Sequence, residues 1–314
     1  MQLKNVALVL SSGGARGLAH IGVIEELEKS GYTITSIAGT SMGSLVGGMY
    51  AAGQLPAFKT WMCSLDKKAV FDLMDFTFST NGVIKGERVF DTMKKMISDR
   101  QIESLPIPYC AVATDIISGK EVVFREGSLY NAIKASSSIP SLITPFTLNE
   151  LLLVDGGVMN PVPINRIKRT KRDLLVVVNV NADIPGLNIT HSNGAANHEN
   201  PGSGNGNGNG NGNEFFNKYK NYFNALRSKD EAPATKNKLE HLGYFEVMLR
   251  SINLMLQRNS ELTIELYKPD ILINISKNSS SIYDFHKTAE IIEAGASAAR
   301  DVLGNVREKK RWLL

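Results

Sequence analysis

The segment GTSMGS, residues 39–44, places a serine between two glycines in the pattern G-x-S-x-G. A β-branched run, TITSIA, precedes it and a small apolar run, LVGGMYAAG, follows it, so we expect a strand, a sharp turn and a helix. Such a turn exposes the hydroxyl of Ser41 at a helix N-terminus, where unpaired N–H groups favour negative charge. Because Gly39 and Gly43 have no side chains, the neighbouring chain can pass close to Ser41. The motif is typical of a nucleophilic serine, but a glycine-rich turn without a catalytic role can have the same sequence pattern.

A second glycine segment, SSGGARG at residues 11–17, stands directly between an expected strand and an expected helix. Glycine loops at this position present backbone N–H groups to an anion. A dinucleotide site would need G-x-G-x-x-G and an acidic residue after the second strand, and a phosphate loop would need G-K-[ST]; both are absent. The remaining interpretation is an oxyanion hole made by the N–H groups of Gly13 and Gly14. Both loops follow successive parallel strands and should emerge at one sheet edge.

A nucleophilic serine needs a base. The best candidate is Asp155 in LLLVDGGVMNPVP, at the end of an apolar strand, where Gly156 and Gly157 let the chain turn without crowding the carboxylate. An ordinary turn aspartate is the alternative. Ser41 with Asp155 and no histidine would be a dyad. The five histidines, none of them in a comparable turn motif, are His20, His191, His198, His241 and His286. Of these, His286 stays open as the third member of a triad.

The elements that must position these residues alternate between strands and helices. Apolar runs predict strands at 6–10, 35–39, 109–115, 121–124, 151–155, 173–181 and 270–276. Helical periodicity predicts helices over 16–31, after Ser41, in several stretches of 58–98, over 128–137 and over 284–306. This order predicts an α/β fold whose largely parallel sheet is covered on both faces.

Composition limits the class of protein. The chain has 314 residues, is 43% hydrophobic and 21% charged, and contains no apolar run long enough for a transmembrane helix. Its first apolar run is too short for a signal peptide and is interpreted as a strand. Two cysteines, Cys63 and Cys110, form no disulfide framework and fit a reducing cytoplasm. The net charge of +4 neither demands nor excludes an anionic partner.

One region interrupts the alternation. Residues 193–214 are a low-complexity segment rich in glycine and asparagine, so we expect a flexible, exposed loop over 184–214. The next segment, 215–260, covers the amphipathic stretch FFNKYKNYFNALRS and all but the last two residues of a second one, YFEVMLRSINLMLQRNSEL. They either pack on the sheet or form a mobile cap that meets lipid. The tail REKKRWLL is either a frayed basic helix end or a contact with anionic lipid.

Four motifs in this order carry a family resemblance. GGARG (residues 13–17), GTSMG (39–43), ASSSIP (135–140) and DGG (155–157) resemble the patatin-like phospholipase family, as represented by its bacterial serine acyl hydrolases, over about half the chain. Ser12 departs from the pattern, because the family usually has a glycine there. For ASSSIP we derive no chemistry beyond shaping the wall of the site.

The resemblance implies a single patatin-like domain over 1–314 with a three-layer α/β/α fold. It also implies hydrolysis of lipid carboxylic esters, of the phospholipase A or lysophospholipase type, without metal or cofactor. Ser41 would attack the acyl carbon, Asp155 would accept and return the proton, and Gly13 and Gly14 would bind the oxyanion. Arg16 would bind a lipid phosphate or form a structural salt bridge.

The implied partner is a lipid or acyl-ester substrate, with possible peripheral contact to a membrane and no nucleic acid. The cellular location would be the cytoplasm. An esterase or thioesterase acting on other acyl groups is an alternative within the enzyme class. A non-catalytic lipid-binding protein is the alternative outside it, although such a protein would not need the serine, the aspartate and both loop glycines. The sequence does not indicate the oligomeric state.

Overall fold

The computed structural model describes residues 4–73, 87–97, 99–140, 143–185 and 244–311. The strands are β1 (Lys4–Leu10), β2 (Tyr32–Thr40), β3 (Tyr109–Asp115), β4 (Lys120–Phe124), β5 (Phe146–Leu148), β6 (Leu151–Asp155), β7 (Leu174–Ala182) and β8 (Ile271–Ser276). The helices are α1 (Ala19–Lys29), α2 (Met42–Ala51), α3 (Leu55–Ser64), α4 (Lys67–Leu73), α5 (Glu87–Ile97), α6 (Leu129–Ser136), α8 (Tyr244–Tyr267) and α9 (Thr288–Arg311). Met1–Asn188 and Arg250–Leu314 belong to one unit of the chain and Ile189–Leu249 to another, and the fold below is that of the first.

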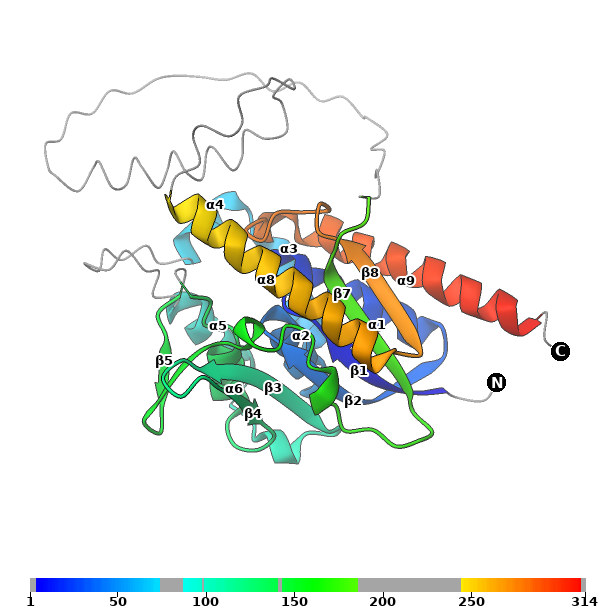
Figure 1. Ribbon diagram of the computed structural model, residues 1–314, viewed down its shortest axis with the longest axis horizontal. Coiled ribbons are helices and arrows are strands. Elements are labelled where there is room, and N and C mark those ends of the chain that lie inside the picture. Colours follow the sequence, from blue (N-terminus) through cyan, green and yellow to red (C-terminus); the bar gives the residue numbers. More distant parts are fainter. Residues whose placement is uncertain (1–3, 74–86, 98, 141–142, 186–243, 312–314) are drawn as a thin grey trace, which may run out of the picture. The chain divides into compact units, whose positions relative to one another are not determined.

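The described strands form one sheet in the order β5-β6-β3-β2-β1-β7-β8, with β4 paired to β3 (Figure 1). The central pairs β3/β2, β2/β1, β1/β7 and β7/β8 are parallel. The pairs β3/β4, β3/β6 and β5/β6 are antiparallel. The prediction of a largely parallel α/β sheet is therefore confirmed, and its antiparallel part lies around β3.

Strand β3 brings the ends of two other strands together. One of its edges is occupied by β4 from Ala111 to Asp115. Its other edge is shared: β2 pairs with it up to Thr40 opposite Val112, and β6 pairs with it from Ala113, opposite Asp155. Because β2 is parallel to β3 and β6 is antiparallel, the two strands run toward each other. Their C-terminal ends meet head to head between two consecutive residues of β3.

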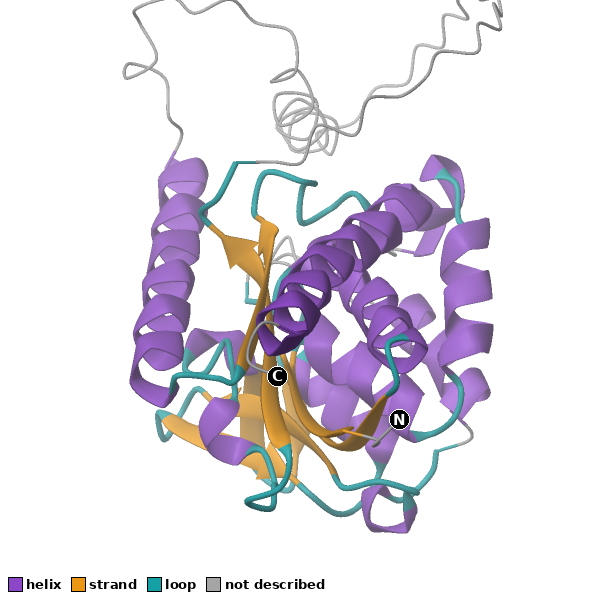
Figure 2. Ribbon diagram, turned by 90° about the vertical axis from the view of Figure 1, so that its right-hand side faces the viewer, coloured by secondary structure: helices purple, strands orange, loops and turns teal. Residues whose placement is uncertain are grey.

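Alternate residues of each strand face opposite layers of helices. On β7, Val176 and Val178 belong to a core shared with α1, α2, α6 and α9, whereas Val177 belongs to a second core on the other face. Ile264 of α8 packs against this second core. Figure 2 shows the sheet between the two helical layers. The three-layer α/β/α expectation is confirmed.

The low-complexity loop expected over 184–214 falls outside the described residues from 186 onward. In the 215–260 segment, residues 215–243 are also outside them, and the second predicted helix corresponds to α8, which begins at Tyr244. Helix α9 extends into the basic tail as far as Arg311. Among the helices of the described residues, none has both the length and the apolar character that a membrane crossing requires.

Candidate active site

Ser41 lies on the sharp turn that the sequence predicts. It follows β2 directly, caps the N-terminus of α2, and has φ 57° and ψ −125°. This positive φ is unusual for a residue with a side chain and stores strain of the order of 1–3 kcal/mol. Its carbonyl accepts hydrogen bonds from the N–H groups of Ser44 (2.9 Å) and Leu45 (3.1 Å) and from the Ser44 hydroxyl (2.7 Å). The first turn of α2 thus fixes the C-terminal side of the strained residue.

The two flanking glycines are required by contact. A Cβ on Gly39 would lie 2.4 Å from the carbonyl oxygen of Gly43, and a Cβ on Gly43 would lie 2.3 Å from the carbonyl oxygen of Leu10. Neither backbone atom can move away without disturbing β1 or α2. The glycines therefore allow the elbow to pack directly against the end of β1.

Asp155 ends β6, and the Ser41 side chain lies close enough to its carboxyl to lower the pKa of that carboxyl. The Gly157 N–H donates to Asp155 Oδ1 at 2.7 Å, and the Asp155 N–H donates to the Ser138 carbonyl at 2.8 Å. Burial raises the pKa of the Asp155 carboxyl from 3.8 to about 6, against the lowering effect of the hydrogen bonds from Ser41 and Gly157. At neutral pH the carboxyl is mostly ionised, and its pKa is close enough to 7 for efficient proton exchange.

Ser41 and Asp155 are both almost fully enclosed, whereas the sequence predicts an exposed hydroxyl at Ser41. Ser41 is 3% exposed and Asp155 is 6% exposed. The reason lies in the sheet: because β2 and β6 meet on the same edge of β3, the two residues at their ends are buried against each other. The D-G-G turn adds to this enclosure, since a Cβ on Gly156 would lie 2.1 Å from the Val112 carbonyl oxygen.

The glycine loop and the elbow are adjacent, as the sequence predicts. Leu10 pairs with Gly39 in the parallel β1/β2 ladder, so both loops leave the same end of the sheet. A Cβ on Gly17 would lie 2.5 Å from Met42 Cβ. Within the described residues, the N–H groups of Gly13 and Gly14 donate to no protein acceptor.

The end of β7 supports this loop. The Asn181 side chain donates to the Ser12 carbonyl at 2.6 Å, and the Ser11 hydroxyl accepts the Val180 N–H at 3.1 Å. A Cβ on Gly13 would lie 2.3 Å from Val180 Cγ2, so a side chain does not fit there. Gly14 has φ +56°, and a Cβ there would lie 2.7 Å from the Ile282 carbonyl oxygen. Glycine is therefore needed at both positions, for space at the first and for backbone conformation at the second.

Arg16 is a cation without a carboxylate partner among the described residues. Its Nη1 donates to the Lys277 carbonyl at 2.9 Å, and its Nε is buried with no partner in the same part of the chain. Burial lowers its pKa to about 10. The described residues thus supply no structural salt bridge for Arg16, which was one of the two roles expected from the sequence.

Neither described histidine contacts the serine–aspartate pair. His20 is fully buried, and its Nε2 lies 2.9 Å from the Ser11 carbonyl, which requires an Nε2–H tautomer. Burial lowers the pKa of His20 to about 4, so this ring is neutral at pH 7. His286 lies in a short turn before α9 that contacts α3 and α4. His191, His198 and His241 fall outside the described residues.

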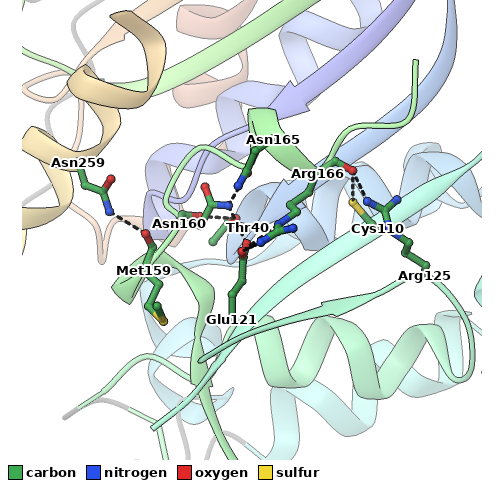
Figure 3. Close-up of polar contacts among 9 residues, drawn as sticks. All are labelled: Thr40, Cys110, Glu121, Arg125, Met159, Asn160, Asn165, Arg166 and Asn259. Carbon is green, nitrogen blue, oxygen red and sulfur yellow. Dashed lines mark hydrogen bonds and ion pairs between the residues drawn. The ribbon is translucent and has the colours of Figure 1, made fainter. Parts of the chain in front are cut away.

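A polar network behind the site escaped sequence analysis (Figure 3). The Thr40 hydroxyl, one residue before Ser41, donates to the Asn160 carbonyl at 2.8 Å. The Asn160 side chain donates to Glu121 Oε1 (2.7 Å) and to Asn165 Oδ1 (2.8 Å), and Arg166 forms an ion pair with the same glutamate. The network ties the end of β2 to the segment after the D-G-G turn. In the sequence, the only indication of this network was Asn160, five residues after Asp155.

The segment after the D-G-G turn presents apolar side chains to solvent. Val158 is 43% exposed and Met159 is 41% exposed. The Asn259 side chain of α8 donates to the Met159 carbonyl at 2.7 Å and holds this segment against the helix (Figure 3). Two exposed apolar side chains therefore follow Asp155 within four residues in the sequence.

The chain is similar in sequence to known proteins. The family model described as patatin-like phospholipase matches residues 8–166. An uncharacterized NTE family protein of Mycobacterium bovis is 34% identical over 327 residues, covering 95% of this chain and 91% of its own length. A second NTE family protein, from Mycobacterium tuberculosis, is 36% identical over 167 residues, covering 52% of this chain and 28% of its own length. The mouse patatin-like phospholipase domain-containing protein 6 is 30% identical over 184 residues, covering 56% of this chain and 14% of its own length.

Proposed function

Because this chain belongs to the patatin-like phospholipase family, whose general activity is lipid acyl hydrolysis, we propose that it cleaves lipid carboxylic esters through a Ser41–Asp155 dyad. The observation that carries the proposal is the head-to-head meeting of β2 and β6 on one edge of β3, which brings Ser41 next to Asp155. We propose that residues 1–314 form one hydrolase domain. We also propose that its activity is of the phospholipase A or lysophospholipase type.

The proposed reaction has two halves. The Ser41 hydroxyl attacks the acyl carbon while its proton passes to Asp155, and the N–H groups of Gly13 and Gly14 stabilise the oxyanion. Collapse of the intermediate releases the alcohol, which takes the proton from Asp155, and leaves the acyl group on Ser41. Water then attacks the acyl-enzyme and gives a proton to Asp155, and the free acid leaves as the Ser41 oxygen takes that proton back. The pKa of about 6 for Asp155 supports both the acceptance and the return of the proton.

A lipid phosphate is the anion we propose for Arg16. Its guanidinium has a buried Nε without a partner and no carboxylate nearby among the described residues, and such a cation is stabilised by an incoming anion. The exposed Val158 and Met159 support peripheral contact between this edge of the site and a lipid surface. Two free cysteines, Cys63 and Cys110, support a cytoplasmic location.

Release of fatty acid tests this proposal. Purified protein is incubated with mixed micelles of phosphatidylcholine and, separately, of lysophosphatidylcholine, and fatty acid is measured for wild type and Ser41→Ala. The proposal expects release by the wild type only, and the preferred micelle identifies the subtype. Release from a soluble acyl ester or thioester but from neither lipid would indicate the esterase alternative. Micelle binding by a folded wild type without any hydrolysis would indicate a lipid-binding protein.

A further inference from the structure

Ser136, in the ASSSIP segment, contacts the backbone of the proposed nucleophile. It is the last residue of α6 and is fully buried. Its hydroxyl accepts the Ser41 N–H at 2.9 Å and donates to the Val112 carbonyl at 2.6 Å. A serine hydroxyl can do both at once, because it has one donor and two acceptor positions.

The hydroxyl stands where a ladder hydrogen bond would otherwise be. Thr40 is the last residue of β2 in register with β3, opposite Val112. In a regular parallel ladder the next bond would join the Ser41 N–H to the Val112 carbonyl. Ser136 is inserted between these two groups instead. The chain can therefore leave the sheet at Ser41 while both buried backbone groups keep a partner.

The hydrogen bond to Ser136 fixes the N-terminal side of Ser41, which α2 does not fix. The carbonyl of Ser41 is fixed by the first turn of α2, and its N–H is fixed by Ser136. Rotation about the N–Cα bond, which lies between these two fixed groups, sets φ, which is 57° here. The direction of the Ser41 hydroxyl toward Asp155 depends on that angle.

The same short segment also contacts the proposed base. The Ser138 carbonyl accepts the Asp155 N–H at 2.8 Å. The Val112 carbonyl that Ser136 holds is also the atom against which Gly156 packs. ASSSIP therefore touches the backbone of both members of the dyad.

We propose that Ser136 is a positioning residue that holds the backbone of Ser41 in the conformation that aims its hydroxyl at Asp155 and the acyl carbon. This inference rests on the proposed dyad. Without the hydroxyl of Ser136, the Ser41 N–H loses its partner and the strained φ is free to relax. Misplacement of a reacting atom by about 1 Å lowers turnover by about a hundredfold.

Three variants test the inference: Ser136→Ala removes the hydroxyl, Ser136→Thr restores it, and Ser137→Ala is the matched control. The Ser137 hydroxyl is buried and has no partner among the described residues. Turnover of p-nitrophenyl butyrate gives kcat and KM, and urea unfolding gives stability. For Ser136→Ala we expect kcat to fall about tenfold to a hundredfold with KM unchanged. For Ser136→Thr we expect most of the turnover to return, although the added methyl lowers stability. Ser137→Ala should have the same kcat and KM as wild type.

The outcomes separate this inference from the proposed function. Wild type that hydrolyses the ester, with Ser41→Ala inactive, supports the dyad. Given that result, an unchanged kcat in Ser136→Ala overturns the positioning role. The positioning role is also overturned if Ser136→Thr does not restore kcat, or if the loss of kcat across the variants follows their loss of stability. A folded wild type without activity, or an active Ser41→Ala, overturns the proposed function and this inference with it.

Discussion

Replacing Asp155 by asparagine should stabilise the protein at neutral pH while removing the proposed base. Burial raises the pKa of this carboxyl from 3.8 to about 6, which means that folding disfavours its ionised form. A shift of about 2 units corresponds to about 3 kcal/mol. Asparagine carries no charge and keeps an oxygen that can accept the Gly157 N–H, so the variant avoids this penalty.

The sign of the effect depends on pH. The pKa of Asp155 is higher in the folded state, so its contribution to stability is fully present below about pH 4 and is lost as the pH rises through about 6. Asp155→Asn should therefore exceed wild type by about 3 kcal/mol near pH 7.5 and by only about 1 kcal/mol near pH 4.5. His20 acts in the opposite direction, because its lowered pKa of about 4 makes stability fall as the pH falls. The pH dependence of wild-type stability therefore contains both effects. The difference in stability between Asp155→Asn and wild type isolates the contribution of Asp155.

Urea unfolding of both proteins at the two pH values measures this difference. Asp115→Asn is the matched control, since hydrogen bonds from Ser118 lower the pKa of Asp115. That variant should lose stability at neutral pH, and the loss should shrink in acid. The reasoning is refuted if Asp155→Asn gains the same stability at both pH values, or if it is less stable than wild type near pH 7.5.

Three further predictions follow from the site. The kcat/KM of wild type for p-nitrophenyl butyrate should rise with pH and level off above about 6, as Asp155 ionises; a profile that is flat between about pH 4.5 and 8 would contradict its role as base. His286→Ala should leave kcat unchanged, whereas membership in a triad would lower it by about a thousandfold or more. Gly43→Ala should lower the urea midpoint, because its Cβ would lie 2.3 Å from a backbone oxygen. Gly304→Ala, at an open and exposed position of α9, should raise the midpoint by removing glycine from a helix; equal effects of the two glycine variants would disprove the steric argument.

The elbow and the glycine loop could be predicted because local signals determine them. Small residues around Ser41 mark a tight turn, and two successive parallel strands must deliver their loops to the same end of a sheet. The contacts of Gly39 and Gly43 follow the same steric logic. These relations involve neighbours in sequence or adjacent strands, and periodicity is sufficient to find them.

The approach of Asp155 to Ser41 has a different origin. It depends on β2 and β6 sharing one edge of β3 and on the register that ends one strand opposite Val112 and the other opposite Ala113. Nothing in the local pattern of LLLVDGG indicates that the strand is antiparallel. From the sequence, Asp155 is a candidate base with an uncrowded carboxylate at a strand end, whereas the fold encloses that residue next to Ser41.

The bridging role of Ser136 was also beyond sequence reasoning. Its motif was visible, but a hydroxyl that replaces one bond of a ladder is recognised only when the three segments around it are placed together. The same holds for Asn160, which connects to Thr40 through its backbone carbonyl. Such contacts depend on long-range packing rather than on residue type.

Labelling with a fluorophosphonate probe tests the central claim most directly, because the probe reacts covalently with an activated serine. Wild type, Ser41→Ala and Asp155→Asn are treated in parallel, and the modified peptide is identified by mass spectrometry. The account predicts a label on Ser41 of the wild type, none on Ser41→Ala, and strongly reduced labelling of Asp155→Asn. A label that survives Ser41→Ala, or a folded wild type that does not react, would contradict it.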